Sequence, residues 1–241
     1  MTPTEKPFSH FDIIDACAQP GCPLCRLSDA VVQRYLDAIV YECINDPPTR
    51  ELLSRSQGYC NEHAWRLTRA SGGAALSTAF VYRSLLTDIS AALEGVPYAR
   101  RDSLARPDKD ARKRVAAGQP PRSLAPELVC PACAQRDQME ALALRALVEA
   151  LGRRDAPMQA ALAGSAGLCL VHLRGALAQS PNAAAFDFLR DDARQHLARL
   201  AAELSEYIRK NDYRFAGEPF GAEGDSWQRA VAAMVGTRGL R

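Results

Sequence analysis

The sequence predicts an all-α protein made of two pseudo-repeated helical halves, each with three cysteines and one histidine. A CPxC motif stands at Cys22–Cys25 and again at Cys130–Cys133, and a GxCxxH motif follows each of them, at Gly58–His63 and Gly167–His172. Ala and Leu dominate the chain, while β-branched and aromatic residues are sparse, which favours helices. Three thiols and an imidazole, used twice in the same order, predict two metal sites.

The similarity between the halves extends beyond the motifs. The segment from Asp46 to about Glu94 aligns without a gap with Asp155 through Glu203, and each segment begins with an Asp that has a Pro one or two residues after it. A repeat of this length is typical of a duplicated helical unit. We therefore expect residues 1–99 to form the first metal-binding repeat and residues 124–210 to form the second.

Helical periodicity and end signals give the elements in order. Apolar residues recur at helical spacing from Leu27 to Ile44, and Asp46 before Pro47 is an N-cap signal for the next helix. Further helices are expected from Cys60 to Ala70, from Ala74 to Glu94 and from about Ala183 to Lys210. Each CPxC motif is expected to form a tight turn that brings its two sulfur atoms together.

We assign eight residues as metal ligands and none as catalytic. The ligands of the first centre are expected to come from the first half, and those of the second from the second half; completion of each site across the halves is the alternative with the same stoichiometry. Cys and His three residues apart at a helix start point to the same side, and the helix N-terminus favours the thiolate. The candidates are Cys22, Cys25, Cys60 and His63, and Cys130, Cys133, Cys169 and His172.

The cofactors expected are two zinc ions, with two [4Fe–4S] clusters as the alternative. Zinc accepts three Cys and one His in a tetrahedral site, and four protein ligands leave no open position for catalysis. Cysteine with one histidine can also hold an iron–sulfur cluster, which would indicate electron transfer or sensing of oxygen or redox state. Redox catalysis by the CxxC pairs is disfavoured, because such pairs accompany a βαβ pattern that this sequence lacks.

Cys17 has the x4 spacing to Cys22 that plant-type ferredoxins show, but Ala125 stands at the matching place in the second half. We expect a buried structural thiol. His10 and His196 have no cysteine motif around them and are not expected to be ligands.

Residues 100–123 are rich in Arg, Lys, Asp and Pro and predict a basic polar linker. The segment 211–241 forms a tail outside the repeat, with a wrapping segment and then a short helix whose start resembles a capping box, Asp225 followed by Gln228. Tyr213, Arg214, Phe215 and Trp227 are candidates for a partner or lid surface.

Composition narrows the class of protein. The 241 residues are 47% apolar and 24% charged with a net charge of +2, which is ordinary for a globular protein and too small to indicate nucleic-acid or membrane binding. The first residues lack the apolar core of a signal peptide, so a cytoplasmic protein is expected, where paired cysteines more often bind metal than form disulfides. A protein partner is favoured over nucleic acid.

The paired motifs, followed by Asp212-Tyr213-Arg214-Phe215 and by Glu223 through Trp227, resemble a bacterial domain-of-unknown-function family of stand-alone helical proteins of this size. The resemblance covers nearly the whole chain. It implies the same eight ligands and a bacterial cytoplasm, and it brings no reaction. A non-catalytic binding or regulatory role is therefore the functional expectation.

Overall fold

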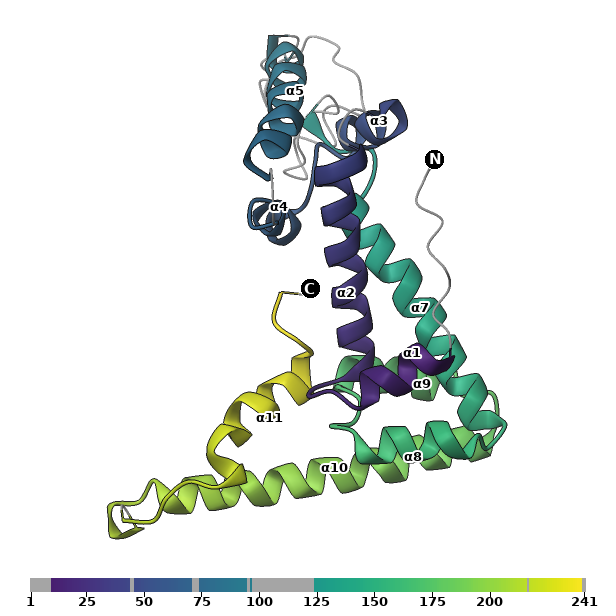
Figure 1. The fold of residues 1–241 in the computed structure, drawn as a ribbon, viewed down its shortest axis with the longest axis vertical. Helices are drawn as coiled ribbons and strands as arrows, with labels where there is room; N and C mark the ends of the chain where they lie inside the picture. Colours follow the sequence, from purple (N-terminus) through teal and green to yellow (C-terminus); the bar gives the residue numbers. More distant parts are fainter. Residues whose placement is uncertain are drawn as a thin grey trace, which may run out of the picture. The chain divides into compact units, whose positions relative to one another are not determined.

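The fold is helical, as the sequence predicts. The computed structural model describes residues 10–43, 46–70, 74–94, 96, 124–215 and 217–239, and within these ranges it contains helices and no strand (Figure 1). None of the helices in these ranges is both long and apolar enough to cross a membrane. The basic segment 100–123 lies outside the described residues.

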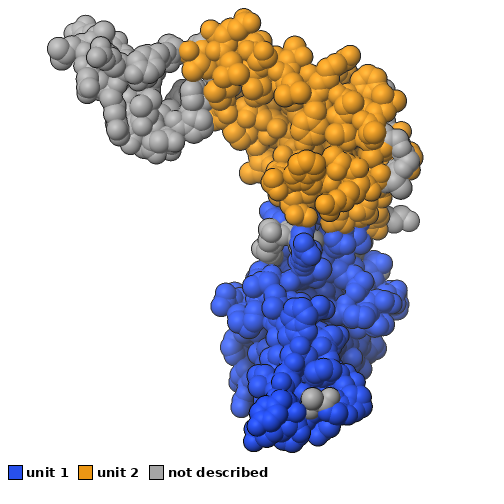
Figure 2. All heavy atoms as spheres, turned by 90° about the vertical axis from the view of Figure 1, so that its left-hand side faces the viewer, with its two compact units in different colours: residues 1–32, 136–241 blue, residues 33–135 orange. Residues whose placement is uncertain are grey.

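The chain divides into two compact units, which Figure 2 shows in different colours. Unit 1 contains residues 1–32 and 136–241, and unit 2 contains residues 33–135. Two helices, α2 (Pro23–Ala38) and α7 (Pro131–Gly152), contribute residues to both units. Each unit therefore takes residues from both halves of the predicted repeat.

Unit 1 is built around α10 (Ala183–Lys210), a helix of 28 residues that packs on α9 (Leu170–Ala178) and α11 (Ser226–Val235) (Figure 1). On another side of the unit, α1 (His10–Cys17) packs on α8 (Ala156–Gly164). The core of the unit combines residues from α1, α2, α7, α8, α9 and α10, including Ile13, Leu24, Leu147, Leu162 and Leu189.

Unit 2 contains the second part of α2, a π-helical turn η1 (Ile39–Cys43), and the helices α3 (Pro47–Arg55), α4 (Asn61–Leu67) and α5 (Ala74–Glu94). Helix α5 packs on α3 and on η1. Its buried residues Val81 and Leu85 face inward, while Leu86 and Leu93 are exposed.

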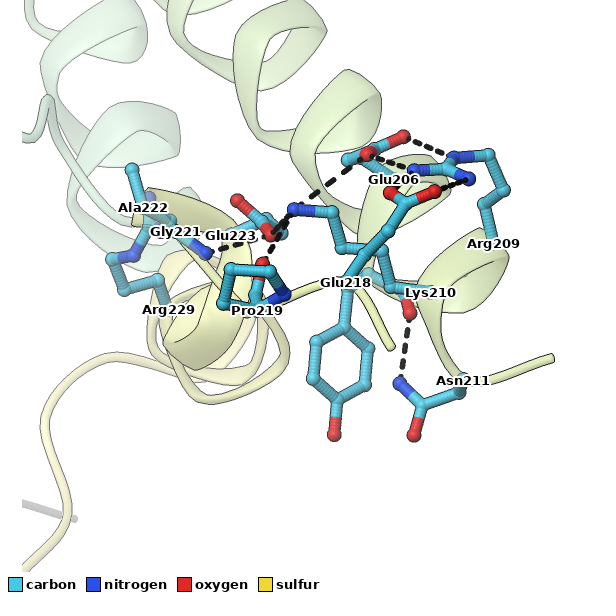
Figure 3. A network of polar contacts seen from close by, with 11 residues as sticks. Glu206, Arg209, Lys210, Asn211, Glu218, Pro219, Gly221, Ala222, Glu223 and Arg229 are labelled. Atoms are coloured by element: carbon cyan, nitrogen blue, oxygen red, sulfur yellow. Dashed lines mark hydrogen bonds and ion pairs between the residues drawn. The ribbon is translucent and has the colours of Figure 1, made fainter. Parts of the chain in front are cut away.

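The tail folds back on α10, as the sequence predicts. The segments η3 (Tyr213–Phe215) and η4 (Ala222–Asp225) both contact α10 (Figure 1). The Lys210 ammonium binds the carboxylate of Glu223 at 2.7 Å, and the Gly221 N–H donates to the same carboxylate at 2.8 Å (Figure 3). The nearby Arg209 guanidinium pairs with Glu206 and Glu218. The ion pairs of Arg209 with Glu218 and of Lys210 with Glu223 hold the tail against the C-terminal end of α10.

Two local expectations need correction. The CPxC motifs are the first turns of α2 and α7 and not separate turns before them, because each proline occupies the first helical position, where its missing N–H is not needed. The capping box at Asp225 does not form: Asp225 is the N-cap of α11 but makes no side-chain cap, since its carboxylate accepts from the Arg229 Nε at 2.7 Å.

Candidate metal centres

All four ligand pairs stand at the start of a helix. Cys60 is the N-cap of α4 and Cys169 is the N-cap of α9, and their carbonyls accept from the Ala64 and Leu173 N–H groups at 2.9 and 2.8 Å. Cys22 and Cys130 play the same part for α2 and α7, where their carbonyls accept from the N–H groups of the residues four positions on. The second ligand of each pair is three residues further and shares the same helix face.

The glycine of GxCxxH is required by both backbone and packing. Gly58 and Gly167 have φ angles of 87° and 76°, in the left-handed region that favours glycine. A Cβ at Gly58 would come within 2.8 Å of the Leu85 side chain, and one at Gly167 within 3.0 Å of the His196 ring. Each glycine therefore sets the turn that places the following cysteine.

The eight predicted residues gather into two groups of four. In each group one ligand atom per residue lies within 4.8 Å of the others. Centre 1 contains Cys22, Cys25, Cys169 and His172, all in unit 1, and centre 2 contains Cys60, His63, Cys130 and Cys133, all in unit 2.

This grouping corrects the expectation that each half completes its own site. The CPxC pair of each half meets the CxxH pair of the other half, which is the alternative that the spacing left open. The cause is the path of the chain, because α2 and α7 begin in different units and bring their ligand pairs to the loops before α9 and α4.

Centre 1 is a close cluster of three sulfur atoms around the Nδ1 atom of His172. The Nδ1 atom lies 3.4 Å from the Sγ atoms of Cys22 and Cys25 and 3.2 Å from that of Cys169. The Sγ atoms of Cys25 and Cys169 are 3.7 Å apart. The four side chains are almost completely buried.

Centre 2 has the same internal geometry. The Nδ1 atom of His63 lies 3.3, 3.5 and 3.4 Å from the Sγ atoms of Cys60, Cys130 and Cys133. The Sγ atoms of Cys60 and Cys133 are 3.7 Å apart. His63 is buried, but the three cysteines remain partly exposed.

The histidine of centre 1 is oriented by a carboxylate. The Glu140 Oε1 atom lies 3.1 Å from the His172 Nε2 atom. If Nδ1 binds a metal, the remaining ring hydrogen is on Nε2 and faces this carboxylate. A carboxylate behind a histidine is a recurrent feature of metal sites, where it fixes the tautomer and raises the basicity of the ligand. Glu140 stands ten residues after Cys130. At the corresponding position, ten residues after Cys22, the chain has Val32.

The tail also reaches centre 1. Gly236, which ends α11 with a φ angle of 88°, lies so close that a Cβ there would be 3.3 Å from the Cys25 Sγ atom and 3.7 Å from the Cys169 Sγ atom. The backbone at Gly236 therefore covers the sulfur atoms. From the sequence, this glycine is identified only as a helix end, and Glu140 is not identified. Glu140 follows Cys133 of centre 2 but contacts His172 of centre 1, so spacing in the sequence gives no signal for its role.

The thiols in each group oppose one another's ionisation. Hydrogen bonding with Cys169 and Cys25, together with burial, raises the pKa of Cys22 far above its ordinary value. Hydrogen bonds from Cys22 and Cys25 lower the pKa of Cys169, so one thiolate forms at the expense of the others. Burial, with the neighbouring Cys130, raises the pKa of Cys133 to about 12. A divalent cation would offset this repulsion, and thiolates are the form that binds metal. The donor set fits such an ion.

The remaining predicted residues lie outside the two groups. Cys17 is buried in the core of unit 1, as expected, and burial raises its pKa to about 11. In the tail, Tyr213 and Trp227 are exposed, and the Arg209 and Arg214 guanidinium groups lie over the Phe215 ring. The partner or lid surface that these residues suggested stays a prediction.

A family model described as a family of unknown function (DUF6062) matches residues 8–239. The chain belongs to this family. The match includes both centres and the tail through Gly236, so the family resemblance expected from the paired motifs and the tail is confirmed.

A relative of the chain is an uncharacterized 23.9 kDa protein in the xynA 3′ region of Caldicellulosiruptor sp. (strain Rt8B.4). It is 24% identical over 229 residues, which cover 94% of this chain and 100% of the relative. No solved structure matches the chain. Family membership therefore brings no activity, and the functional argument depends on the two centres.

Proposed function

We propose that this protein binds two zinc ions, one in each Cys3His centre, and that it is a non-catalytic binding or regulatory module. The observation that carries the proposal is the spacing of the ligand atoms. A tetrahedral zinc site with Zn–S bonds of about 2.3 Å and a Zn–N bond of about 2.0–2.1 Å has edges of about 3.8 Å between sulfur atoms and about 3.5 Å between sulfur and nitrogen.

The measured distances are close to those edges in both centres. One pair of sulfur atoms in each centre is 3.7 Å apart, Cys25 with Cys169 and Cys60 with Cys133, and the distances from sulfur to Nδ1 are 3.2–3.5 Å. In a [4Fe–4S] cluster each protein ligand binds a different iron, so the sulfur atoms would be separated by two metal–ligand bonds and an iron–iron distance. The compact spacing therefore supports a single ion over a cluster.

A non-catalytic role follows from the ligand count. Catalytic zinc keeps a position open for water or substrate, whereas four protein ligands fill a tetrahedral site. Each ion would join the N-termini of two helices, α2 with α9 in unit 1 and α7 with α4 in unit 2. Binding free energy would then contribute directly to folding, as in other structural zinc sites.

Metal and acid-labile sulfide analysis tests this proposal on protein purified without oxygen. We expect two zinc ions per chain, no sulfide and no visible colour. Iron with labile sulfide and a brown absorption spectrum would contradict the zinc assignment and support the iron–sulfur alternative, in which the protein would act in electron transfer or sensing. A chain that folds with neither metal would contradict both.

A further inference from the structure

A cavity of about 350 Å³ in unit 1 borders centre 1, because Cys22 and Cys169 are among its lining residues. It lies between the loops that carry Cys22 and Cys169, helix α10 and helix α11. Its volume is within the range of about 300–1,000 Å³ that is typical of pockets for small ligands. Cys22 is the most exposed of the centre 1 ligands, at 8%, and it lines this cavity.

The wall of the cavity is mostly apolar, with Leu197 and Leu200 from α10 and Ala233 from α11. Four charged side chains also line it, two guanidinium groups and two carboxylates. Both carboxylates are already engaged: the Arg229 guanidinium binds Asp225 at 2.7 Å and also pairs with Glu203.

The second guanidinium is that of Arg199, and some of its N–H donors remain available for a ligand. It donates to the Nδ1 atom of His196, whose Nε2 atom lies 3.3 Å from the Asp192 carboxylate. The contact of Nε2 with a carboxylate places the hydrogen there, so Nδ1 is the acceptor that holds Arg199. A guanidinium has five N–H donors, and His196 is the partner that Arg199 has within the described part of the chain.

We propose that this cavity binds a small organic anion, with its acidic head group at Arg199 and its apolar body against Leu197, Leu200 and Ala233. A guanidinium matches the paired oxygens of a carboxylate or a phosphate, and its charge strengthens both hydrogen bonds. Because the four charges of the wall balance, selectivity for an anion depends on Arg199. This site is separate from the zinc proposal and needs no reaction at the metal.

The test is a fluorescence titration of the full-length, metal-loaded protein with two dyes. Anilinonaphthalene sulfonate carries a negative head group, and phenylnaphthylamine has the same rings without it. We expect Arg199→Gln to weaken binding of the sulfonate dye by at least about tenfold, the contribution of a charge-assisted hydrogen bond, and to leave the neutral dye unchanged. Arg194→Gln is the matched control, because it removes the same charge from an exposed position of α10 outside the cavity wall.

A second pair of variants tests whether the dyes bind in this cavity. Ala233→Trp should fill the cavity and weaken both dyes, whereas Ala198→Trp, at an exposed position of α10, should not. Helix content by circular dichroism and bound zinc identify any variant that fails to fold. Competition by octanoate and octyl phosphate, with octanol as the neutral comparison, separates a carboxylate from a phosphate ligand.

Equal effects of Arg199→Gln and Arg194→Gln, or competition by octanol as strong as by either anion, would overturn the assignment of an anion site. Unchanged binding of both dyes to a folded Ala233→Trp variant would overturn the assignment to this cavity. Either result would leave the zinc proposal intact, because metal content is measured separately.

Discussion

At the scale of single residues, the two centres depend on a short local arrangement used four times. An N-cap cysteine and a second ligand three residues later place two donor atoms on one side of a helix start. The unpaired N–H groups and the dipole of the helix end stabilise a negative sulfur there. Two such helix starts are enough to surround one ion.

The pairing of these helix starts can be tested by counting metal ions in variants. Cys60→Ser should lower the zinc content from two ions to one, because it removes a ligand of centre 2. Adding Cys130→Ser should leave that content at one, since both changes affect the same centre. Combining Cys60→Ser with Cys22→Ser should instead remove both ions, because these residues belong to different centres.

The measurement is the number of zinc ions bound per chain after gel filtration. Retention of one ion by the Cys22→Ser, Cys60→Ser protein would show that each half completes its own site and would contradict the grouping across halves.

Glu140 is expected to strengthen centre 1 without touching the metal. Glu140→Ala removes the acceptor that holds the His172 Nε2–H, so we expect zinc affinity at centre 1 to fall by about 10–100-fold. The measurement is competition with a chromophoric chelator in a Cys60→Ser background, where only centre 1 contributes. Glu149→Ala, at an exposed position of the same helix, is the control. Equal affinities of the two variants would assign Glu140 no positioning role.

At the scale of elements, the ion pair between Lys210 and Glu223 makes the attachment of the tail sensitive to acid. The Gly221 N–H and the Lys210 ammonium lower the pKa of Glu223 to about 2. Because the pKa is lower in the folded state than the ordinary value of 4.5, the stabilisation is complete above about pH 4.5 and is lost as the pH falls toward 2.

We therefore expect Glu223→Gln to lower the free energy of unfolding at pH 6 and to converge with the wild-type protein as the pH falls below 4. Urea unfolding across this pH range measures the free energy of unfolding of both proteins. Acid affects the metal centres of both proteins alike, so this effect cancels in the difference between them. A difference that stays constant with pH would show that the carboxylate charge of Glu223 does not hold the tail.

The elements themselves were largely predictable from sequence, because their ends have local causes. Helices α5 and α10 have the expected bounds, and Asp46 and Asp155 cap α3 and α8 through their side chains. The two local expectations that were wrong, the start of α2 and the capping box of α11, also have local causes. At α2, the proline of CPxC fits the first helical position, and at α11, Arg229 takes the carboxylate that the capping box needed.

At the scale of the whole molecule, the identity of the ligands could be predicted but their partners could not. Spacing within CPxC or CxxH fixes which two atoms share a helix start, since that is decided within one turn. Which two helix starts meet is decided by long connections and by the core of each unit. Glu140 and Gly236 were missed for the same reason, because each is distant in sequence from the ligand that it contacts.

The two centres have the same internal geometry but different surroundings, and this predicts an order of metal loss. The four ligands of centre 1 are at most 8% exposed, Glu140 holds its histidine, and Gly236 covers two of its sulfur atoms. The three cysteines of centre 2 are partly exposed. A chelator or a thiol reagent must reach a ligand before the metal leaves, so centre 2 should lose its ion first.

Zinc release to excess chelator should accordingly have two phases of equal amplitude. Cys60→Ser, which removes centre 2, should retain only the slow phase, and Cys169→Ser, which removes centre 1, should retain only the fast phase. The reverse assignment would show that exposure of the cysteines does not control release. A single phase in the wild-type protein would mean that loss of one ion unfolds the other centre as well, so that the two units would act as one cooperative structure despite their separate ligand sets.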